Sequence, residues 1–200
     1  MLPARVLFLS AVLIATWASA CFAQQTGRVL GGQEPPQPVR GEVRAIADPA
    51  LIRSFGELCK RVDLIVEGTV ETDAGRMMPG RGLPIETDFW IKVDRVLKGS
   101  VDTDKIVVSE AGGAVGDLHL IMNFPLLQRG QRYVLLLYTD KRPGIPPVPD
   151  LPRYQAEIFY GTFAVDAGYI HPVFVNSFEG KYIGMTVEAF AAEIAAELKR

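Results

Sequence analysis

An alternation of apolar and polar side chains over residues 88–99 is the clearest pattern in the chain. Three apolar side chains alternate there with three others: Phe89, Ile91 and Val93 with Trp90, Lys92 and Asp94. Because successive side chains of a strand point to opposite faces, this pattern predicts a β-strand with one face against a core. We interpret the segments that follow as its partners.

Related patterns predict further strands at residues 64–71, 106–110, 118–122, 132–138, 154–165 and 169–175. Gly68, inside the first of these, indicates a bulge or the close approach of another backbone. Residues 132–138 are apolar on both faces, which is typical of a central strand. Residues 166–168 separate the last two strands and predict a three-residue hairpin loop.

Two segments have helical spacing. Asp48 followed by Pro49 predicts a helix start, and an apolar stripe follows: Leu51, Phe55, Leu58, Cys59 and Val62. Because Cys59 lies on this stripe, we expect its thiol to be buried and unreactive. Thr186 is expected to cap a second helix over residues 186–200, which carries a similar stripe.

Two stretches between the expected strands lack any hydrophobic period. Residues 72–84 contain three glycines and predict a long mobile loop, with an exposed tip that is a candidate partner-binding surface: Arg76, Met77, Met78 and Arg81. A tolerated insertion is the alternative interpretation. Residues 141–153 carry five prolines and predict an extended surface loop, either a rigid connector or a segment that docks into an aromatic-lined groove of a partner.

These elements together predict a mainly β protein. We expect an OB-like antiparallel barrel of about five to seven strands over residues 46–185, with an N-terminal helix. The amphipathic helix at 186–200 would pack on the barrel. Two hundred residues, of which 48% are hydrophobic, suffice for one such core.

The N-terminus predicts export. Arg5, an apolar run over residues 6–16 and small residues before position 24 form a signal peptide over residues 1–23. Residues 24–45, rich in Gly, Pro and Gln, are expected to be a flexible tether of a periplasmic or secreted protein. Alternatively, residues 18–21 form a lipoprotein box, and acylated Cys21 is a lipid anchor on a membrane. No later stretch has the length of apolar residues that a transmembrane helix needs.

Charge and cysteine content exclude some classes of function. The chain has a net charge of −2 with scattered basic residues, which disfavours nucleic-acid binding. Cleavage after Ala23 would leave Cys59 as the only cysteine, so a disulfide framework within one mature chain is not expected.

The sequence contains no recognisable catalytic or cofactor-binding set. His119 and His171 lack a second ligand at metal-binding spacing, so no metal site and no cofactor are expected. Ser109-Glu110 is the nearest approach to a nucleophile, but the strand-to-helix elbow is missing. Residues 111–116 form a Gly-rich turn without a following helix, so a phosphate cradle is not expected. We therefore expect a non-enzymatic protein.

Three segments carry a family resemblance: residues 61–70 (RVDLIVEGTV), 89–99 with the ending VLKG, and 127–138 with RGQRY. Over residues 46–175 the chain resembles a widespread group of uncharacterised exported bacterial domains. More distantly, it is similar to the OB-like barrel of netrin-module and tissue-metalloproteinase-inhibitor proteins. The resemblance implies the fold rather than an activity. Those inhibitors use a disulfide-tethered N-terminal cysteine, so none of their inhibitory residues transfers to this chain.

The leading hypothesis is an exported binding or interaction module, whose partner is another protein or a component of the cell envelope. One alternative, which rests on the resemblance, is an inhibitor or regulator of an extracellular protease. A second alternative is a hydrolase with a site assembled from residues far apart in the sequence.

Overall fold

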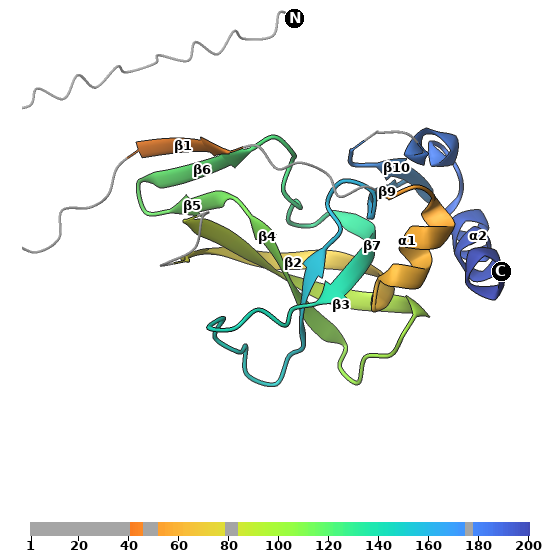
Figure 1. The fold of residues 1–200 in the computed structure, drawn as a ribbon, viewed down its shortest axis with the longest axis horizontal. Helices are drawn as coiled ribbons and strands as arrows, with labels where there is room; N and C mark the ends of the chain where they lie inside the picture. Colours follow the sequence, from red (N-terminus) through yellow and green to blue (C-terminus); the bar gives the residue numbers. More distant parts are fainter. Residues whose placement is uncertain (1–40, 46–51, 79–83, 175–177) are drawn as a thin grey trace, which may run out of the picture. The chain divides into compact units, whose positions relative to one another are not determined.

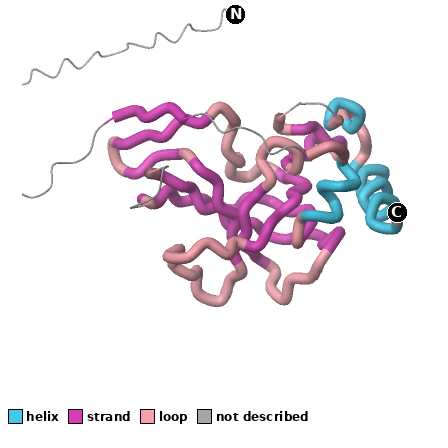
Figure 2. The backbone as a smooth tube through the Cα atoms, in the orientation of Figure 1, coloured by secondary structure: helices cyan, strands magenta, loops and turns pink. Residues whose placement is uncertain are grey.

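The computed structural model describes residues 41–45, 52–78, 84–174 and 178–200 (Figures 1 and 2). Strands dominate this part of the chain, and the helices lie near its two ends in the sequence. The elements are β1 Gly41–Ala45, α1 Phe55–Arg61, β2 Leu64–Met77, β3 Ile85–Lys98, β4 Lys105–Ala111, β5 Gly113–Val115, β6 Leu118–Met122, β7 Arg132–Thr139, β8 Arg153–Ala156, β9 Thr162–Asp166, β10 Tyr169–Pro172, a 3-10 helix at Glu179–Tyr182, and α2 Val187–Lys199.

Five strands close a barrel in the order β2-β3-β4-β8-β7. The neighbours are antiparallel except β4 and β8, which run parallel, and the pairing of β7 with β8 completes the ring. Since β8 lies between β4 and β7, the barrel closes with the Greek-key connectivity of an OB-like fold. Strands β9 and β10 extend the same sheet beyond β7. The predicted mainly β, OB-like architecture is confirmed.

The alternating patterns place one set of side chains inside the barrel. Phe89 and Ile91 of β3 lie there with apolar residues of β2, β4 and β7. At Gly68 the register of β2 against β3 shifts, and an added Cβ would lie 2.5 Å from the carbonyl oxygen of Lys92. The bulge and the close approach predicted at Gly68 are therefore confirmed. Strand β7 is buried on both faces, as its sequence predicts.

A second core lies between the outside of the barrel and the helices. The rings of Phe55, Phe163, Tyr182 and Phe190 pack together, with centroids 4.7–6.2 Å apart. We call this group the aromatic cluster. The predicted helix cap is confirmed at Thr186, whose hydroxyl accepts a hydrogen bond from the Ala189 amide at 3.2 Å.

The first helix starts later than predicted. Ser54, not Asp48, is its N-cap, and the Ser54 hydroxyl accepts a hydrogen bond from the Glu57 amide at 3.1 Å. Asp48 and Pro49 lie outside the described residues. Cys59 is fully buried, as its place on the apolar stripe predicts, and burial raises the pKa of its thiol to about 12.

A small second sheet, β1-β6-β5, corrects two predictions. Residues 41–45 were expected in a flexible tether but form β1, which pairs in parallel with β6. The Gly-rich stretch was expected to be one turn, yet residues 113–115 form β5. Positive φ angles at Gly112 and Gly113, +112° and +106°, let the chain leave β4 and pair with β6.

The loop predicted at residues 72–84 is also wrong in extent. Strand β2 continues to Met77 and β3 begins at Ile85, so most of this stretch is a long hairpin. Cross-strand ion pairs from Arg76 of β2 to Glu86 and Asp88 of β3 stabilise this end of the hairpin. Gly75 allows close contact with β5, since an added Cβ would lie 2.1 Å from the Ala114 carbonyl oxygen.

The expected strand at 154–165 is interrupted. A turn in which the Gly161 amide donates to the Glu157 carbonyl at 2.8 Å separates β8 from β9. The hairpin between β9 and β10 has a two-residue loop rather than three residues. Both loop residues have positive φ, +48° at Ala167 and +85° at Gly168, which is typical of a type I′ turn.

Candidate functional site

Charged side chains gather on the outer face of the barrel where the β2–β3 hairpin meets the loop between β7 and β8. Figure 1 shows this β7–β8 loop projecting from the barrel. We call the group the barrel-end network and the loop, residues 140–152, the proline loop. The network consists of Arg76, Glu86, Asp88, Ser109, Asp140, Arg142 and Arg153.

Asp88 of β3 is the centre of one half of the network. Its Oδ1 accepts hydrogen bonds from Ser109 Oγ at 2.7 Å and from Arg153 Nη1. Its Oδ2 accepts from Arg76 Nε at 3.0 Å. The side chains of Asp88 and Arg153 are only 7% and 9% exposed. Either charge would be costly to bury alone, and each neutralises the other.

Glu86 is the centre of the other half and connects the hairpin to the proline loop. Its Oε2 accepts from Arg76 Nη2 at 2.6 Å and from Arg142 Nη2 at 3.1 Å. Asp140 holds the same Arg142 in a bidentate pair, Nε–Oδ1 2.9 Å and Nη2–Oδ2 2.7 Å. Burial alone would raise the pKa of Asp140, but the hydrogen bonds from Arg142 outweigh it and lower that pKa.

The proline loop is turned rather than extended, which corrects the prediction for residues 141–153. Val148 and Leu151 form an isolated antiparallel bridge, and Asp150 between them has φ +60°. Arg142 anchors the first part of the loop to Glu86. Arg153, which follows the last residue of the loop, pairs with Asp88. Its Nη2 lies 3.5 Å from the Pro146 carbonyl oxygen. Both ends of the loop are thus fixed to β3.

A groove of about 320 Å³ lies along this loop. Its wall is apolar, and its polar side comes from the barrel-end network and the end of β7. The apolar lining consists of Ile145, Pro146, Pro147, Val148, Leu151 and Pro152. Such a combination of apolar wall and few fixed polar groups is the usual composition of a binding surface.

The structure does not present the residues predicted to form one loop tip as a single exposed surface, although the Arg76 guanidinium contacts the Met78 sulfur. Arg76 belongs to the barrel-end network with a side chain only 17% exposed, and Met78 is buried. Met77 is 46% exposed, whereas Arg81 lies outside the described residues, as does Cys21. The prediction of an exposed, adaptable tip is therefore wrong for Arg76 and Met78. In the sequence, a basic residue, Arg76, and two acidic residues, Glu86 and Asp88, lie on opposite sides of the hairpin turn. These opposite charges were a signal that could have predicted the pairing.

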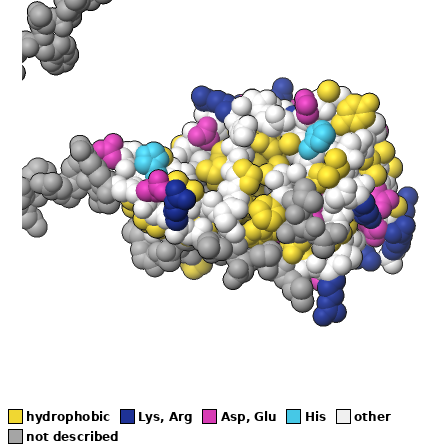
Figure 3. Space-filling view, turned by 90° about the horizontal axis from the view of Figure 1, so that it is seen from above, with side chains coloured by type: hydrophobic (Ala, Val, Ile, Leu, Met, Phe, Trp, Pro, Cys, Tyr) yellow, Lys and Arg dark blue, Asp and Glu magenta, His cyan; other side chains and the backbone are white. Residues whose placement is uncertain are grey.

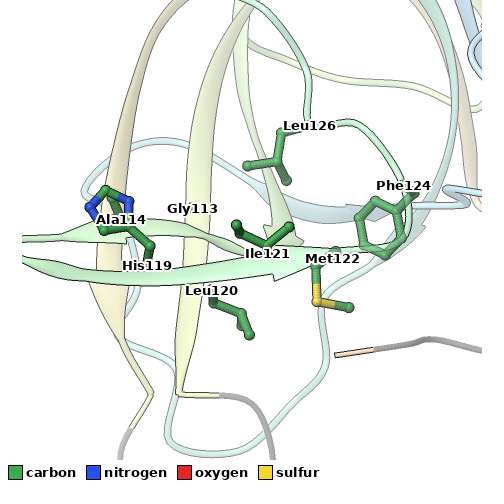
Figure 4. A pocket seen from close by; sticks show the side chains of 8 residues that line it. All are labelled: Gly113, Ala114, His119, Leu120, Ile121, Met122, Phe124 and Leu126. Atoms are coloured by element: carbon green, nitrogen blue, oxygen red, sulfur yellow. The ribbon is translucent and has the colours of Figure 1, made fainter. Parts of the chain in front are cut away.

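A second hollow, of about 330 Å³, lies on the β5–β6 hairpin (Figure 4). Its lining is almost entirely apolar and includes Phe124, Leu126 and Ile121, with His119 at one side. Figure 3 shows hydrophobic side chains near the middle of one face of the molecule, with charged side chains toward its rim. The described residues that line this hollow do not include the converging polar groups that fix a ligand's orientation, so the groove of the proline loop is the better candidate.

The motifs that carry the family resemblance have structural roles. Lys98 Nζ donates to the carbonyl oxygens of Cys59, Lys60 and Val62 at 2.8, 3.0 and 2.5 Å, and so caps the end of α1. Gly99 follows with φ +81°. Arg129 Nε donates to the Glu71 carbonyl at 3.0 Å, which fixes the turn before β7. These contacts give the motifs a role in the fold.

Ser109, the nearest approach to a nucleophile in the sequence, lies among charged partners. Ser109 Oγ donates to Asp88 and accepts from Arg153 Nη1 at 2.7 Å, with no imidazole in this arrangement. Burial makes Cys59 a poor nucleophile. Among the described residues, no group of three or more His, Cys, Asp or Glu side chains could hold a metal ion.

Comparison with known proteins gives no functional assignment. No protein-family model matches the sequence, and no curated protein is significantly similar to it. None of the helices in the described ranges is long and apolar enough to cross a membrane. The function is therefore inferred from the geometry of the site.

Proposed function

We propose that the protein is an exported, non-enzymatic interaction module that binds a segment of another protein in the groove of the proline loop. The observation that carries this proposal is the double anchoring of the loop. Arg142 binds Glu86 and Asp140, while Arg153 binds Asp88 beyond the other end of the loop. A loop fixed in advance loses little conformational entropy when a partner binds.

The chemistry of the groove favours a protein partner. Its wall of aliphatic and proline side chains suits apolar side chains, and the adjacent Arg142 is partly exposed at 23%. Protein interfaces typically combine an apolar centre with arginine and a polar rim. The first 23 residues, with the pattern of a signal peptide, support export, and a partner in the cell envelope or outside the cell follows from this.

Site-specific photocrosslinking in the native host tests this function. A photoreactive amino acid replaces Pro147, an exposed residue of the groove, and in a matched control it replaces Tyr169 of β10, which is 48% exposed. We expect one discrete crosslinked product from position 147 only, and its loss when Arg142→Ala is added. Equal products from both positions, or a product from 147 that Arg142→Ala leaves unchanged, would contradict the proposal.

A further inference from the structure

Strand β1 is an edge strand. It pairs in parallel with β6 on one side and stands at the end of the β1-β6-β5 sheet (Figure 1). Four of its five residues are exposed. In the described part of the chain no strand pairs with its outer edge. The unpaired backbone groups of such an edge can accept another strand.

The two faces of β1 differ. Val43 lies opposite Leu120 of β6, on the face that packs over Ile85, yet Val43 itself is 41% exposed. Glu42 and Arg44 point to the other face, where Arg44 Nε donates to Glu42 Oε1 at 2.7 Å. The strand therefore presents an apolar side chain at the margin of a core and a charged pair on its solvent face.

We propose that the partner of β1 is β1 of a second copy of the chain, paired antiparallel about a two-fold axis at Val43. In this register each Glu42 lies opposite Arg44 of the second copy, and the two Val43 side chains meet on the other face. Opposite charges directly across an antiparallel pair stabilise it, as do paired β-branched side chains. The sequence GEVRA is thus complementary to itself in one antiparallel register.

The second copy is favoured over an unrelated strand for two reasons. A two-fold contact uses the same patch twice and requires it to be self-complementary, which the order Glu42, Val43, Arg44 provides. The contact also continues an existing core, because Val43 lies next to Leu120 and Ala45 contacts the same cluster. A contact through one five-residue strand buries little surface area compared with stable protein interfaces, so we expect a dimer that dissociates on dilution.

Sedimentation velocity of the purified full chain over a range of concentrations tests this inference. We expect a shift from monomer to dimer with rising concentration. The variant Glu42→Arg places like charges opposite each other and should remain monomeric at concentrations where the wild type is mostly dimeric. The double variant Glu42→Arg/Arg44→Glu restores complementary charges in the same register and should restore the dimer.

Three outcomes would overturn the inference: a wild-type monomer at every concentration, a dimer that Glu42→Arg does not weaken, or a double variant that stays monomeric. Both substituted residues are exposed, and circular dichroism of each variant checks that it folds. As a second readout, Val43→Cys should form an intermolecular disulfide under oxidation. Ile183→Cys, at an exposed position, is the matched control and should form no such disulfide.

Discussion

Ser109 and Glu110 are neighbours on β4 but belong to opposite environments. The Ser109 side chain faces the barrel-end network, where the buried Asp88 is bound by arginines. Glu110 lies on the face of Ile106 and Val108 inside the barrel, and accepts a hydrogen bond from the Leu127 amide at 3.2 Å. Burial raises the pKa of Glu110 to about 8.

This comparison shows two ways of burying a carboxyl group. On the outer face the carboxylates are paired with guanidinium groups, and the pairs connect a loop to the barrel. Among the residues that the structure describes, no cation is paired with Glu110, so near neutral pH the group is held mainly in its protonated form. Paired charges hold the proline loop to the barrel, whereas the unpaired acid makes stability depend on pH.

The largest loss of stability is expected when Asp88, the central carboxylate of the network, is removed. We expect Asp88→Ala to lower the free energy of unfolding by about 3–5 kcal/mol, because it leaves Arg153 buried without its main partner. Urea denaturation measures the loss. The exposed Arg200→Ala, which removes only a surface pair with Glu197, should cost about 1 kcal/mol or less. A similar small loss for Asp88→Ala would show that the network does not carry buried charge.

Glu110→Gln tests whether the buried, unpaired acid makes stability depend on pH. The folded-state pKa, about 8, lies above the ordinary 4.5, so the wild type should keep the full contribution of Glu110 below pH 4.5 and lose it as pH rises to about 8. The Gln variant should lack this loss and be on the order of 2–4 kcal/mol more stable than wild type at pH 9. Urea midpoints from pH 4 to 9 measure it. Parallel pH profiles for the two proteins would contradict a buried neutral Glu110.

A structural motif can be tested in the same way. Lys98→Met should cost roughly 1–3 kcal/mol, because the carbonyl groups at the end of α1 lose a charged donor. Urea denaturation measures the loss. Lys92→Met, on the same strand, is the control and should change stability little. If the two variants are equally stable, the Val-Leu-Lys-Gly motif does not act through this cap.

The smallest effect on global stability is expected from Arg142→Ala. Without this arginine, Glu86 keeps Arg76 as a partner and Asp140 keeps the backbone amide of residue 142, so we expect a loss of only about 1–2 kcal/mol in urea denaturation. Its main consequence should be local, namely a less ordered proline loop and weaker partner binding. A loss as large as that of Asp88→Ala would show that this arginine supports the whole barrel rather than the loop.

Period-two alternation was enough to predict β3 and the first half of β2, and a run apolar on both faces predicted β7, because each has side chains in a buried core. The same reasoning missed β1, whose residues are mostly exposed and whose partner β6 lies more than seventy residues further along the chain. It also assigned the charged end of the β2–β3 hairpin to a loop. The barrel-end network joins residues from β2, β3, β4, β8 and the proline loop, and only the closed barrel brings them together.

Hydrogen exchange of the proline loop tests the central claim most directly. Two of its amides form internal hydrogen bonds, Arg142 to Asp140 Oδ1 at 3.1 Å and Leu151 to the Val148 carbonyl at 3.4 Å. We predict that both exchange slowly in the wild type and much faster in Arg142→Ala, while amides of β7 do not change. Fast exchange of both amides in the wild type, or equal rates in the two proteins, would contradict a loop held in place for binding.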